Sequence, residues 1–215
     1  MSAILRGKSL TERAADEIRR RILTGDFQLG EPLSENTLAA EFGISKTPVR
    51  EALVQLKMEG LVHIHPQRGS FVFDMTVEQI AALGELRETL EVAALDLAMQ
   101  RNPADLIAAL KRLLLDMEAA LAAEDYVRYR ELDDGFHCAL FEHCGNKMML
   151  QGYRSFASRI QALRQRLSVD PNLNGVSLSE HRAIVERLTN GDVAGAQAEL
   201  RVHMACTVEK FQAAR

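Results

Sequence analysis

The chain has 215 residues, of which 47% are hydrophobic and 26% are charged, and its formal net charge is −4. Such a composition can bury a real core in one large or two small domains. No apolar run approaches the length of a membrane span, and the amino terminus lacks the apolar core of a signal peptide. The three cysteines lack the spacing of a disulfide framework, so we expect a cytoplasmic protein without membrane association.

Acidic and basic residues are unevenly distributed along the chain. Residues 1–73 carry nearly equal numbers of each, whereas acidic residues predominate in residues 74–215. A near-neutral segment can still bind DNA if its basic groups lie on one face. The acidic remainder is not expected to contact phosphate.

The amino-terminal part contains the signals of three helices. A capping box that starts at Ser9 opens the first helix. A turn-rich connector over residues 27–33 leads to a short helix over residues 34–42, and Gly43 can adopt the left-handed conformation that ends it. Ser45 follows as the expected N-cap of a third helix. These elements predict a helix-turn-helix.

The hydrophobic period changes after Gly60. Residues 61–65 and 70–73 are β-prone runs joined by residues 66–69, which predicts a hairpin with a basic tip. Three helices and a two-stranded wing make a winged helix-turn-helix over residues 1–73. Lys46, Thr47 and Arg50 lie near the start of its third helix, where a recognition helix presents side chains and free N–H groups to DNA.

The remainder, residues 76–215, is predicted to be an all-α antiparallel bundle of six amphipathic helices. The breaks between helices are marked by capping residues, prolines and glycines, and a polar loop is expected over residues 170–175. The predicted helices run over residues 76–101, 102–123, 125–143, 146–168, 177–190 and 192–213. The fold class is therefore mainly α.

Both the amino-terminal segment and the helical remainder of this chain resemble a known family. Residues 33–61 contain Leu-Ser-Glu, then Phe-Gly-Ile-Ser-Lys-Thr-Pro-Val-Arg-Glu-Ala-Leu, and then Gly-Leu. They resemble the DNA-binding domain of GntR-type bacterial transcription regulators. The helical remainder resembles the ligand-sensing FCD domain of the FadR subfamily, and its six helices look like the VanR branch.

The resemblance implies a set of operator contacts. It implies that Arg50 contacts a base or phosphate, that Lys46 and Thr47 also contact the operator, and that the wing tip at Arg68 and Gly69 lies along the minor groove. Asn36 and Lys46 stand where the family usually has arginine. Lysine lacks the fork that reads guanine bidentately, so the half-site is expected to differ or to be read less tightly. The alternative for these charges is an ordinary solvated helix face.

A polar constellation lies on the apolar stripes of the bundle. Asp133 and His137 are four residues apart and point the same way from one helix, while His181 and His203 lie in the apolar stripes of the last two helices. Together they predict a divalent transition metal site for Zn²⁺, Ni²⁺ or Mn²⁺, and the spacing resembles the metal-binding FCD pattern. The alternative is a set of hydrogen-bonded core residues. Asp134 projects about 100° away and is expected to face solvent.

Two arginines are candidate ligand-binding residues. The resemblance implies that Arg87, in the first bundle helix, faces the pocket and pairs with an organic acid. The alternative is a surface arginine paired with Glu91, four residues later. Arg159 is a second candidate for the same role.

These observations predict a homodimeric transcriptional regulator that binds a pseudo-palindromic operator in double-stranded DNA. We expect it to act as a repressor. A small carboxylate metabolite bound at the metal site would modulate its operator affinity. The competing hypothesis is an enzyme, a metal-dependent hydrolase or lyase with a DNA-binding appendage. We expect no enzyme, because no general base is evident beside the predicted ligands. A structural DNA-binding protein without metal or effector is the third possibility.

Overall fold

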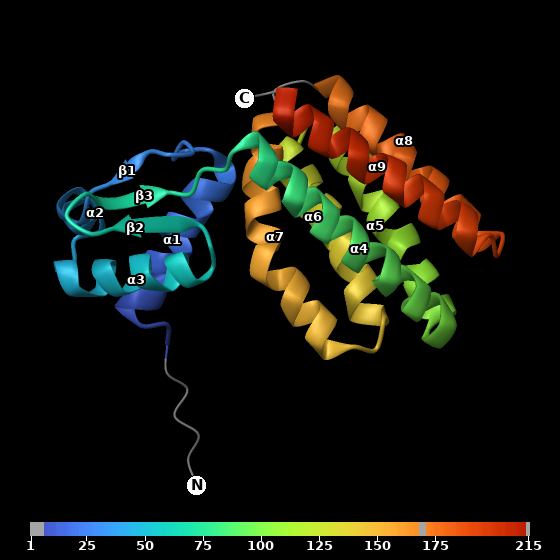
Figure 1. Ribbon diagram of the computed structural model, residues 1–215, viewed down its shortest axis with the longest axis horizontal. Coiled ribbons are helices and arrows are strands. Elements are labelled where there is room, and N and C mark those ends of the chain that lie inside the picture. Colours follow the sequence, from blue (N-terminus) through green and yellow to red (C-terminus); the bar gives the residue numbers. More distant parts are fainter. Residues whose placement is uncertain (1–6, 168–170, 214–215) are drawn as a thin grey trace, which may run out of the picture. The chain divides into compact units, whose positions relative to one another are not determined.

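The structure is a computed structural model that describes residues 7–167 and 171–213. Contacts between Cα atoms divide the chain after Asp74 into two compact units. The amino-terminal unit combines helices with a small sheet, and the carboxy-terminal unit is helical (Figure 1). Among the described residues, no helix is both long and apolar enough to cross a membrane.

The amino-terminal unit is a winged helix-turn-helix, as predicted. Its buried core comes from the apolar faces of three helices. The core residues include Ile18, Leu53 and Leu56, which are at most 1% exposed. The elements are α1 (Leu10–Thr24), β1 (Pro32–Leu33), α2 (Glu35–Phe42), α3 (Lys46–Met58), β2 (Val62–His65) and β3 (Gly69–Val72).

The sheet has three strands in the order β1-β3-β2, one more than the sequence predicts. The additional strand lies in the expected connector, where Pro32 pairs with Phe71 and Leu33 with Ser70 in an antiparallel register. Two residues are too few for a period-2 pattern, and proline normally counts against a strand. Proline is tolerated here because β1 lies at the edge of the sheet.

The turn between α2 and α3 follows the predicted chemistry with one exception. Gly43 ends α2 in the left-handed conformation, with φ of 63°, and its N–H bonds back to carbonyls of α2. Ser45 occupies the N-cap of α3, as expected, but its side chain makes no capping hydrogen bond. The first N–H groups of α3 therefore lack the side-chain partner that a serine usually supplies.

The carboxy-terminal unit contains six helices within its described residues, which confirms the predicted bundle. Helix α5 packs antiparallel to α6, α8 packs antiparallel to α9, and α4 packs against α9 in antiparallel and against α6 in parallel direction (Figure 1). The helices are α4 (Val77–Arg101), α5 (Pro103–Ala122), α6 (Tyr126–His143), α7 (Lys147–Leu167), α8 (Pro171–Thr189) and α9 (Val193–Ala213).

The start of α8 differs from the prediction. Residues 171–175 are helical, whereas a polar loop was expected there; Ser168 and Asp170 lie outside the described residues. Tertiary contacts outweigh the low helix propensity of this segment. The hydroxyl of Tyr129 on α6 donates a hydrogen bond of 2.9 Å to the carbonyl of Asn174, and both residues are buried.

Close packing of α4 against α9 depends on Gly84. A Cβ atom at this position would overlap the side chain of Val208 on α9. Glycine therefore permits the two helix backbones to approach more closely than any other residue would. One and two turns beyond Gly84, α4 carries two buried charged residues, Arg87 and Glu91.

Candidate DNA-binding surface and buried histidine cluster

The residues predicted to contact DNA lie on the surface of the amino-terminal unit. Lys46, Thr47 and Arg50 are exposed in the first two turns of α3, and Asn36 is exposed near the start of α2. The opposite face of α3 is buried through Val49 and the leucines of the core. The helix therefore presents its polar amino-terminal end to solvent, as a recognition helix requires.

Arg50 is held by a carboxylate in the free protein. Its Nε and Nη2 atoms donate hydrogen bonds of 2.9–3.2 Å to both carboxylate oxygens of Glu35, at the start of α2. Arg50 remains largely exposed, since 68% of its side chain is accessible. The Glu35 carboxylate raises the pKa of Arg50, so the guanidinium is charged. Sequence reasoning did not identify Glu35.

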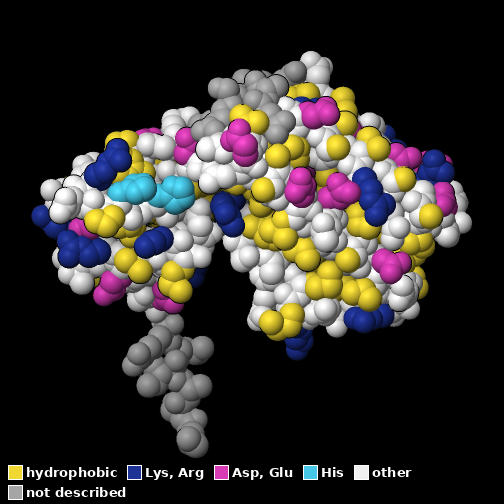
Figure 2. All heavy atoms as spheres, in the orientation of Figure 1, with side chains coloured by type: hydrophobic (Ala, Val, Ile, Leu, Met, Phe, Trp, Pro, Cys, Tyr) yellow, Lys and Arg dark blue, Asp and Glu magenta, His cyan; other side chains and the backbone are white. Residues whose placement is uncertain are grey.

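The wing tip is exposed as predicted. Arg68 ends the β2–β3 turn and Gly69 begins β3, and Gln67 and Gly69 have positive φ values of 63° and 96°. His63 and His65 are exposed on β2, and their rings are 6.1 Å apart. Figure 2 shows basic and histidine side chains on this face of the amino-terminal unit. This surface offers cationic and hydrogen-bonding groups suited to a DNA backbone.

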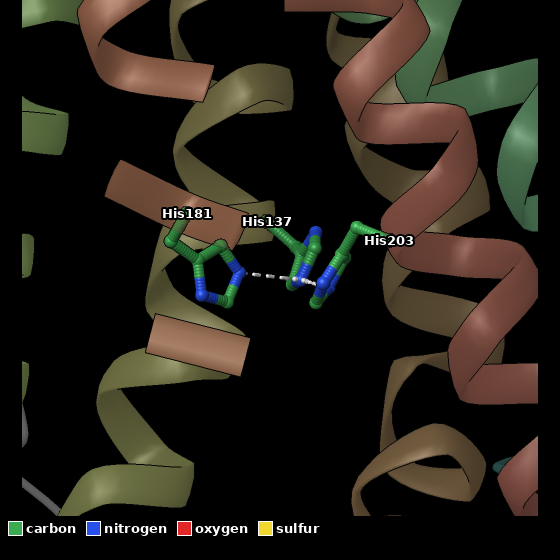
Figure 3. Close-up of side chains that lie close together, drawn as sticks. All are labelled: His137, His181 and His203. Carbon is green, nitrogen blue, oxygen red and sulfur yellow. Dashed lines mark hydrogen bonds between the residues drawn. The ribbon is translucent and has the colours of Figure 1, made fainter. Parts of the chain in front are cut away.

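In the bundle, three predicted metal ligands meet. His137 on α6, His181 on α8 and His203 on α9 point their rings toward one another (Figure 3). The Nε2 atom of His137 lies 3.3 Å from the Nε2 atoms of both other histidines. All three residues are at most 2% exposed. Each therefore directs one nitrogen at a common, water-excluded point.

Two carboxylates, one buried and one partly exposed, hold the outer nitrogens of two of these rings. The Nδ1 atom of His137 donates to Glu91 on α4 at 2.6 Å, and the Nδ1 atom of His203 donates to Glu180 on α8 at 2.6 Å. A carboxylate can only accept, so the proton of each neutral imidazole is on Nδ1. The Nε2 lone pairs of His137 and His203 then face each other with no proton between them. That arrangement favours a cation at their meeting point.

The histidines are neutral in this environment. Burial lowers the pKa values of His181 and His203 to about 3 and lowers that of His137 well below its usual value, and nearby charges such as Arg87 and Arg164 act in the same direction. Neutral imidazole is the form that binds a metal ion. These side chains are therefore ready to coordinate without first losing a proton.

The spacing of the nitrogens fits a tetrahedral metal ion. Two nitrogen ligands at the usual Zn–N distance lie about 3.4 Å apart on a tetrahedral ion, and His137 Nε2 is 3.3 Å from each partner nitrogen. The three nitrogens together lie within 4.8 Å of one another. A carboxylate on the outer nitrogen of a ligating histidine is also the usual support of such a site.

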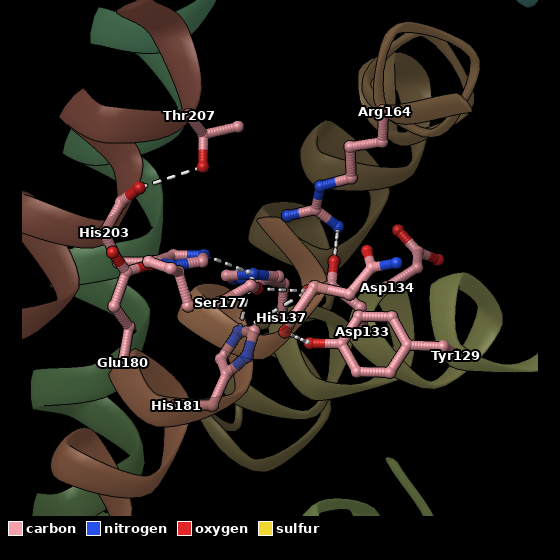
Figure 4. A network of polar contacts seen from close by, with 12 residues as sticks. Tyr129, Asp133, Asp134, His137, Arg164, Ser177, Glu180, His181, His203 and Thr207 are labelled. Carbon is pink, nitrogen blue, oxygen red and sulfur yellow. Dashed lines mark hydrogen bonds and ion pairs between the residues drawn. The ribbon is translucent and has the colours of Figure 1, made fainter. Parts of the chain in front are cut away.

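Asp133, the fourth predicted ligand, lies beside this group and is not part of it. Its Oδ1 atom is 3.7 Å from His181 Nε2 and accepts a hydrogen bond of 3.3 Å from the hydroxyl of Ser177. Its Oδ2 atom forms an ion pair with Nη1 of Arg164 on α7 (Figure 4). Burial alone would raise the pKa of Asp133, but Arg164 and the histidines lower it, so the carboxylate is ionised.

Asp134 does not face solvent, contrary to expectation. It is partly buried because α7 packs against α6, and it accepts a hydrogen bond of 3.2 Å from the hydroxyl of Tyr153. Burial raises its pKa. The rotation of about 100° per residue directs Asp134 away from Asp133, but α7 covers the side of α6 to which it points.

Of the two candidate ligand-binding arginines, Arg87 is deeply buried and pairs with Glu91 at 2.5 Å. The pairing with Glu91 is the alternative that the sequence left open, but it lies in the core and not at the surface. Nη2 of Arg87 is buried and has no hydrogen-bond partner among the described residues. Arg159 on α7 is partly buried, and it does not line the cavity next to the histidines.

A small cavity of about 50 Å³ adjoins the cluster. It opens between α6, α7, α8 and α9, and its lining includes Asp133, Arg164 and His203. Basic and hydroxyl groups complete the wall, from Arg130, Lys210, Tyr129, Ser177 and Thr207, with Leu173 and Asn174. The cationic lining suits a small anion next to the histidine nitrogens.

Sequence reasoning missed three charged residues of this region, of which Glu91 is buried and the other two are partly buried. Glu91, Glu180 and Arg164 reach the cluster only because helices distant in the sequence pack together. Glu91 gave one signal, because it follows Arg87 by one turn on an apolar stripe. Glu180 and Arg164 resemble solvated helix charges in the sequence.

Comparisons with known proteins agree with this architecture. Residues 10–72 match the family "Bacterial regulatory proteins, gntR family", and residues 82–205 match the FCD domain. The chain is 32% identical over 201 residues to an HTH-type transcriptional regulator in an unstable DNA locus of Streptomyces ambofaciens, covering 93% of this chain and 84% of that protein. It is 34% identical to the Nta operon transcriptional regulator of Aminobacter aminovorans, covering 73% of this chain and 77% of that one.

Solved structures show the same fold. A GntR transcriptional regulator from Rhodococcus sp. RHA1 superposes with a TM-score of 0.84 at 26% identity, covering 97% of this chain and 100% of that one. E. coli McbR/YncC superposes with a TM-score of 0.79 at 21% identity, covering 95% of this chain and 98% of that one.

The gluconate operon transcriptional repressor of Bacillus subtilis is 34% identical over 58% of this chain and 51% of its own length.

Proposed function

Because the chain belongs to the gntR family of bacterial regulatory proteins and carries an FCD domain, it is a transcriptional regulator, and we propose that a metal-assisted organic acid controls its DNA affinity. One observation carries this proposal: three neutral histidine nitrogens converge inside the bundle, next to a cavity with a basic lining. No family relationship of this chain points to an enzyme, so the hydrolase or lyase hypothesis is set aside.

On the DNA side, we propose that the protein binds a pseudo-palindromic operator as a homodimer. One amino-terminal unit offers a single recognition helix, and two-fold symmetry supplies the second for the other half-site. Arg50, Lys46, Thr47 and Asn36 are exposed on α2 and α3, which supports their role as operator contacts. Arg68 and Gly69 on the wing are exposed as well, at a place suited to the minor groove.

In the bundle, His137, His181 and His203 would hold a divalent transition metal such as Zn²⁺, Ni²⁺ or Mn²⁺, with Asp133 close enough to serve as a further ligand. A bound ion of this kind supplies an open coordination position and a positive charge for a ligand carboxylate. Glu91 and Glu180 fix the tautomers of two of the histidines. Arg87 contributes through Glu91, since it neutralises that buried carboxylate.

The effector that fits best is a small organic acid. Arg130, Arg164 and Lys210 give the cavity wall an excess of positive charge. The gluconate operon protein is named a repressor, which supports repression as the default action of this chain. The effector can change operator affinity only to the extent that it binds the DNA-competent and DNA-free forms differently. The cytoplasm, where operator and metabolite are both available, is the compartment that this function requires.

The test uses the full chain and the duplexes that flank its gene. The protein is stripped with a chelator, reloaded with Zn²⁺, and titrated into each duplex in the presence and absence of a panel of carboxylates. We expect a salt-sensitive preference for one duplex, bound Zn²⁺, and weaker binding with at least one acid. If the reloaded protein held no Zn²⁺ and no carboxylate changed its DNA affinity, the metal-assisted mechanism would be refuted. Turnover of an acid would support an enzyme.

A further inference from the structure

Asp133 lies between the guanidinium of Arg164 and the neutral imidazole of His181. Its Oδ2 atom pairs with Arg164, and its Oδ1 atom is 3.7 Å from the Nε2 atom of His181. Both partners of the ion pair are deeply buried, with 5% of the Asp133 side chain and 10% of the Arg164 side chain accessible. One carboxylate thus stands next to the histidine nitrogens and next to a buried guanidinium at the same time.

Arg164 has binding capacity that Asp133 does not use. Its Nη2 atom is buried and makes no hydrogen bond with any described residue. Arg164 and Asp133 both line the cavity beside the cluster, together with Arg130, Lys210, Ser177 and Thr207. A buried guanidinium whose paired carboxylate moved away would be destabilised unless another anion replaced it.

Building on the metal site proposed above, we propose that Asp133 exchanges between Arg164 and the three-histidine site, and that an organic carboxylate takes its place on Arg164. When Asp133 turns toward the histidines, Arg164 is left with its planar fork facing the cavity and without an anion. A ligand carboxylate fits that fork bidentately. Metal loading would thereby create the anion site.

The exchange makes the two ligands cooperative. Without metal, an incoming carboxylate must displace Asp133 from Arg164, and the displaced aspartate has no cation to contact. With metal, Asp133 is already engaged elsewhere. Metal should therefore raise anion affinity, and by linkage the anion should raise metal affinity by the same factor. Couplings between sites are typically about 5–150-fold.

The experiment measures succinate and Zn²⁺ binding by calorimetry, with chelator-treated protein as the starting material. For the unmodified chain, we expect the succinate Kd to fall at least about fivefold when one equivalent of Zn²⁺ is present. Equal Kd values with and without Zn²⁺, or no succinate binding in the zinc-loaded protein, would overturn the proposal. A chain that binds no Zn²⁺ at all would instead refute the proposed metal function, so the two failures are distinct.

Two substitutions separate the partners. In Asp133→Asn the neutral amide releases Arg164, so zinc-free protein should bind succinate at least about fivefold more tightly than the zinc-free parent. In Arg164→Gln the released Asp133 is free for the histidine site, so Zn²⁺ affinity should rise while succinate binding is lost. Weaker Zn²⁺ binding by Arg164→Gln, or weaker succinate binding by zinc-free Asp133→Asn, would contradict the exchange.

Asp134→Asn provides the matched control. It removes the neighbouring carboxylate on the same helix, whose observed hydrogen bond is to Tyr153. It should retain both Zn²⁺ binding and the dependence of succinate binding on Zn²⁺. Thermal unfolding of each variant, followed by circular dichroism, checks that the bundle is intact. The Zn²⁺ titration of Arg164→Gln tests the exchange even if its succinate binding is too weak to measure.

Discussion

The two units of this protein place their functional charges in opposite environments. On the amino-terminal unit, Arg50 remains 68% exposed even though it is paired with Glu35. In the bundle, the side chains of His137 and Glu91 are completely inaccessible and bonded to each other. A surface that reads DNA can lose a charge without loss of folding, whereas a buried site couples each charge to stability.

The difference lies in what each site must do before its ligand arrives. A DNA-reading surface needs accessible side chains that can exchange an intramolecular partner for a phosphate or a base. A buried metal site needs fixed nitrogens with the correct tautomer, which requires a second layer of polar residues. Substitutions on the DNA-reading surface should therefore change binding alone, whereas substitutions in the buried site should also change folding stability.

The largest expected effect is the loss of metal from the bundle. Replacement of His181 and His203 by alanine removes two of three converging nitrogens, so bound Zn²⁺ should fall from about one equivalent per chain to none. Elemental analysis of dialysed protein measures this. His63→Ala with His65→Ala, on the exposed wing, is the control and should keep its metal. An unchanged stoichiometry in the His181 and His203 double variant would exclude both from the site.

Acid should destabilise the bundle of the chelator-treated protein. Unfolded histidine titrates near pH 6.5, whereas the folded pKa values of His181 and His203 are about 3. The unfolded state thus binds more protons between these values, so the free energy of unfolding decreases as the pH falls below about 6.5. Each histidine contributes up to about 1.4 kcal/mol per pH unit. Urea unfolding as a function of pH measures the slope, and a flat profile would contradict the neutral cluster.

Next in size is the effect of Arg50→Ala on DNA binding. Loss of the contact should weaken operator binding by about 1–3 kcal/mol and leave the helical content unchanged, since the side chain is exposed. Gel shift and circular dichroism measure the two quantities. Arg20→Ala is the control, because Arg20 is an exposed arginine of α1 that pairs with Glu17 and Asp26. Unaltered operator affinity for Arg50→Ala would remove Arg50 from the interface.

Glu91→Gln tests the outer layer of the metal site. The amide can no longer enforce the Nδ1–H tautomer of His137, so Zn²⁺ affinity should fall about 10–100-fold. Competition with a chelating dye gives the Kd. Glu88→Gln, three residues earlier on α4, changes an exposed carboxylate that pairs with Arg201 and should have no effect. Equal affinities of the two variants would assign Glu91 to folding alone.

The smallest effect is expected for Glu35→Gln. This change removes a negative charge that competes with DNA for Arg50, and exposed ion pairs contribute only about 0.2–1 kcal/mol. Binding to any duplex should tighten by up to about fivefold, with a smaller gain for the operator than for a random sequence. Fluorescence anisotropy with both duplexes measures the ratio. Weaker operator binding would instead mean that Glu35 holds Arg50 in its reading orientation.

Sequence patterns predicted the elements of both units well, because capping residues and helical periods are local. Gly43 and the capping box at Ser9 end and start helices where expected. Strand β1 and the first turn of α8 were missed for the opposite reason. Two residues show no period, and residues 171–175 are helical through contacts such as the Tyr129 hydrogen bond to Asn174.

The site divides in the same way. The convergence of His137, His181 and His203 was predictable because each lies on an apolar helical stripe, and buried imidazoles need partners. The surrounding charges were not predictable, since Glu180 and Arg164 show their role only when separate helices pack. The position of Asp133 on Arg164, and not among the histidine nitrogens, also depends on that packing.

Gly84 adds a steric condition to this chemistry. It lets α4 and α9 lie close together, and these two helices carry Glu91, which pairs with His137, and His203, a member of the cluster. A methyl group at position 84 would act as a spacer that pushes the two helices apart. At the proposed metal site, a residue without a side chain would thereby limit the size of the ion that the three histidines could hold.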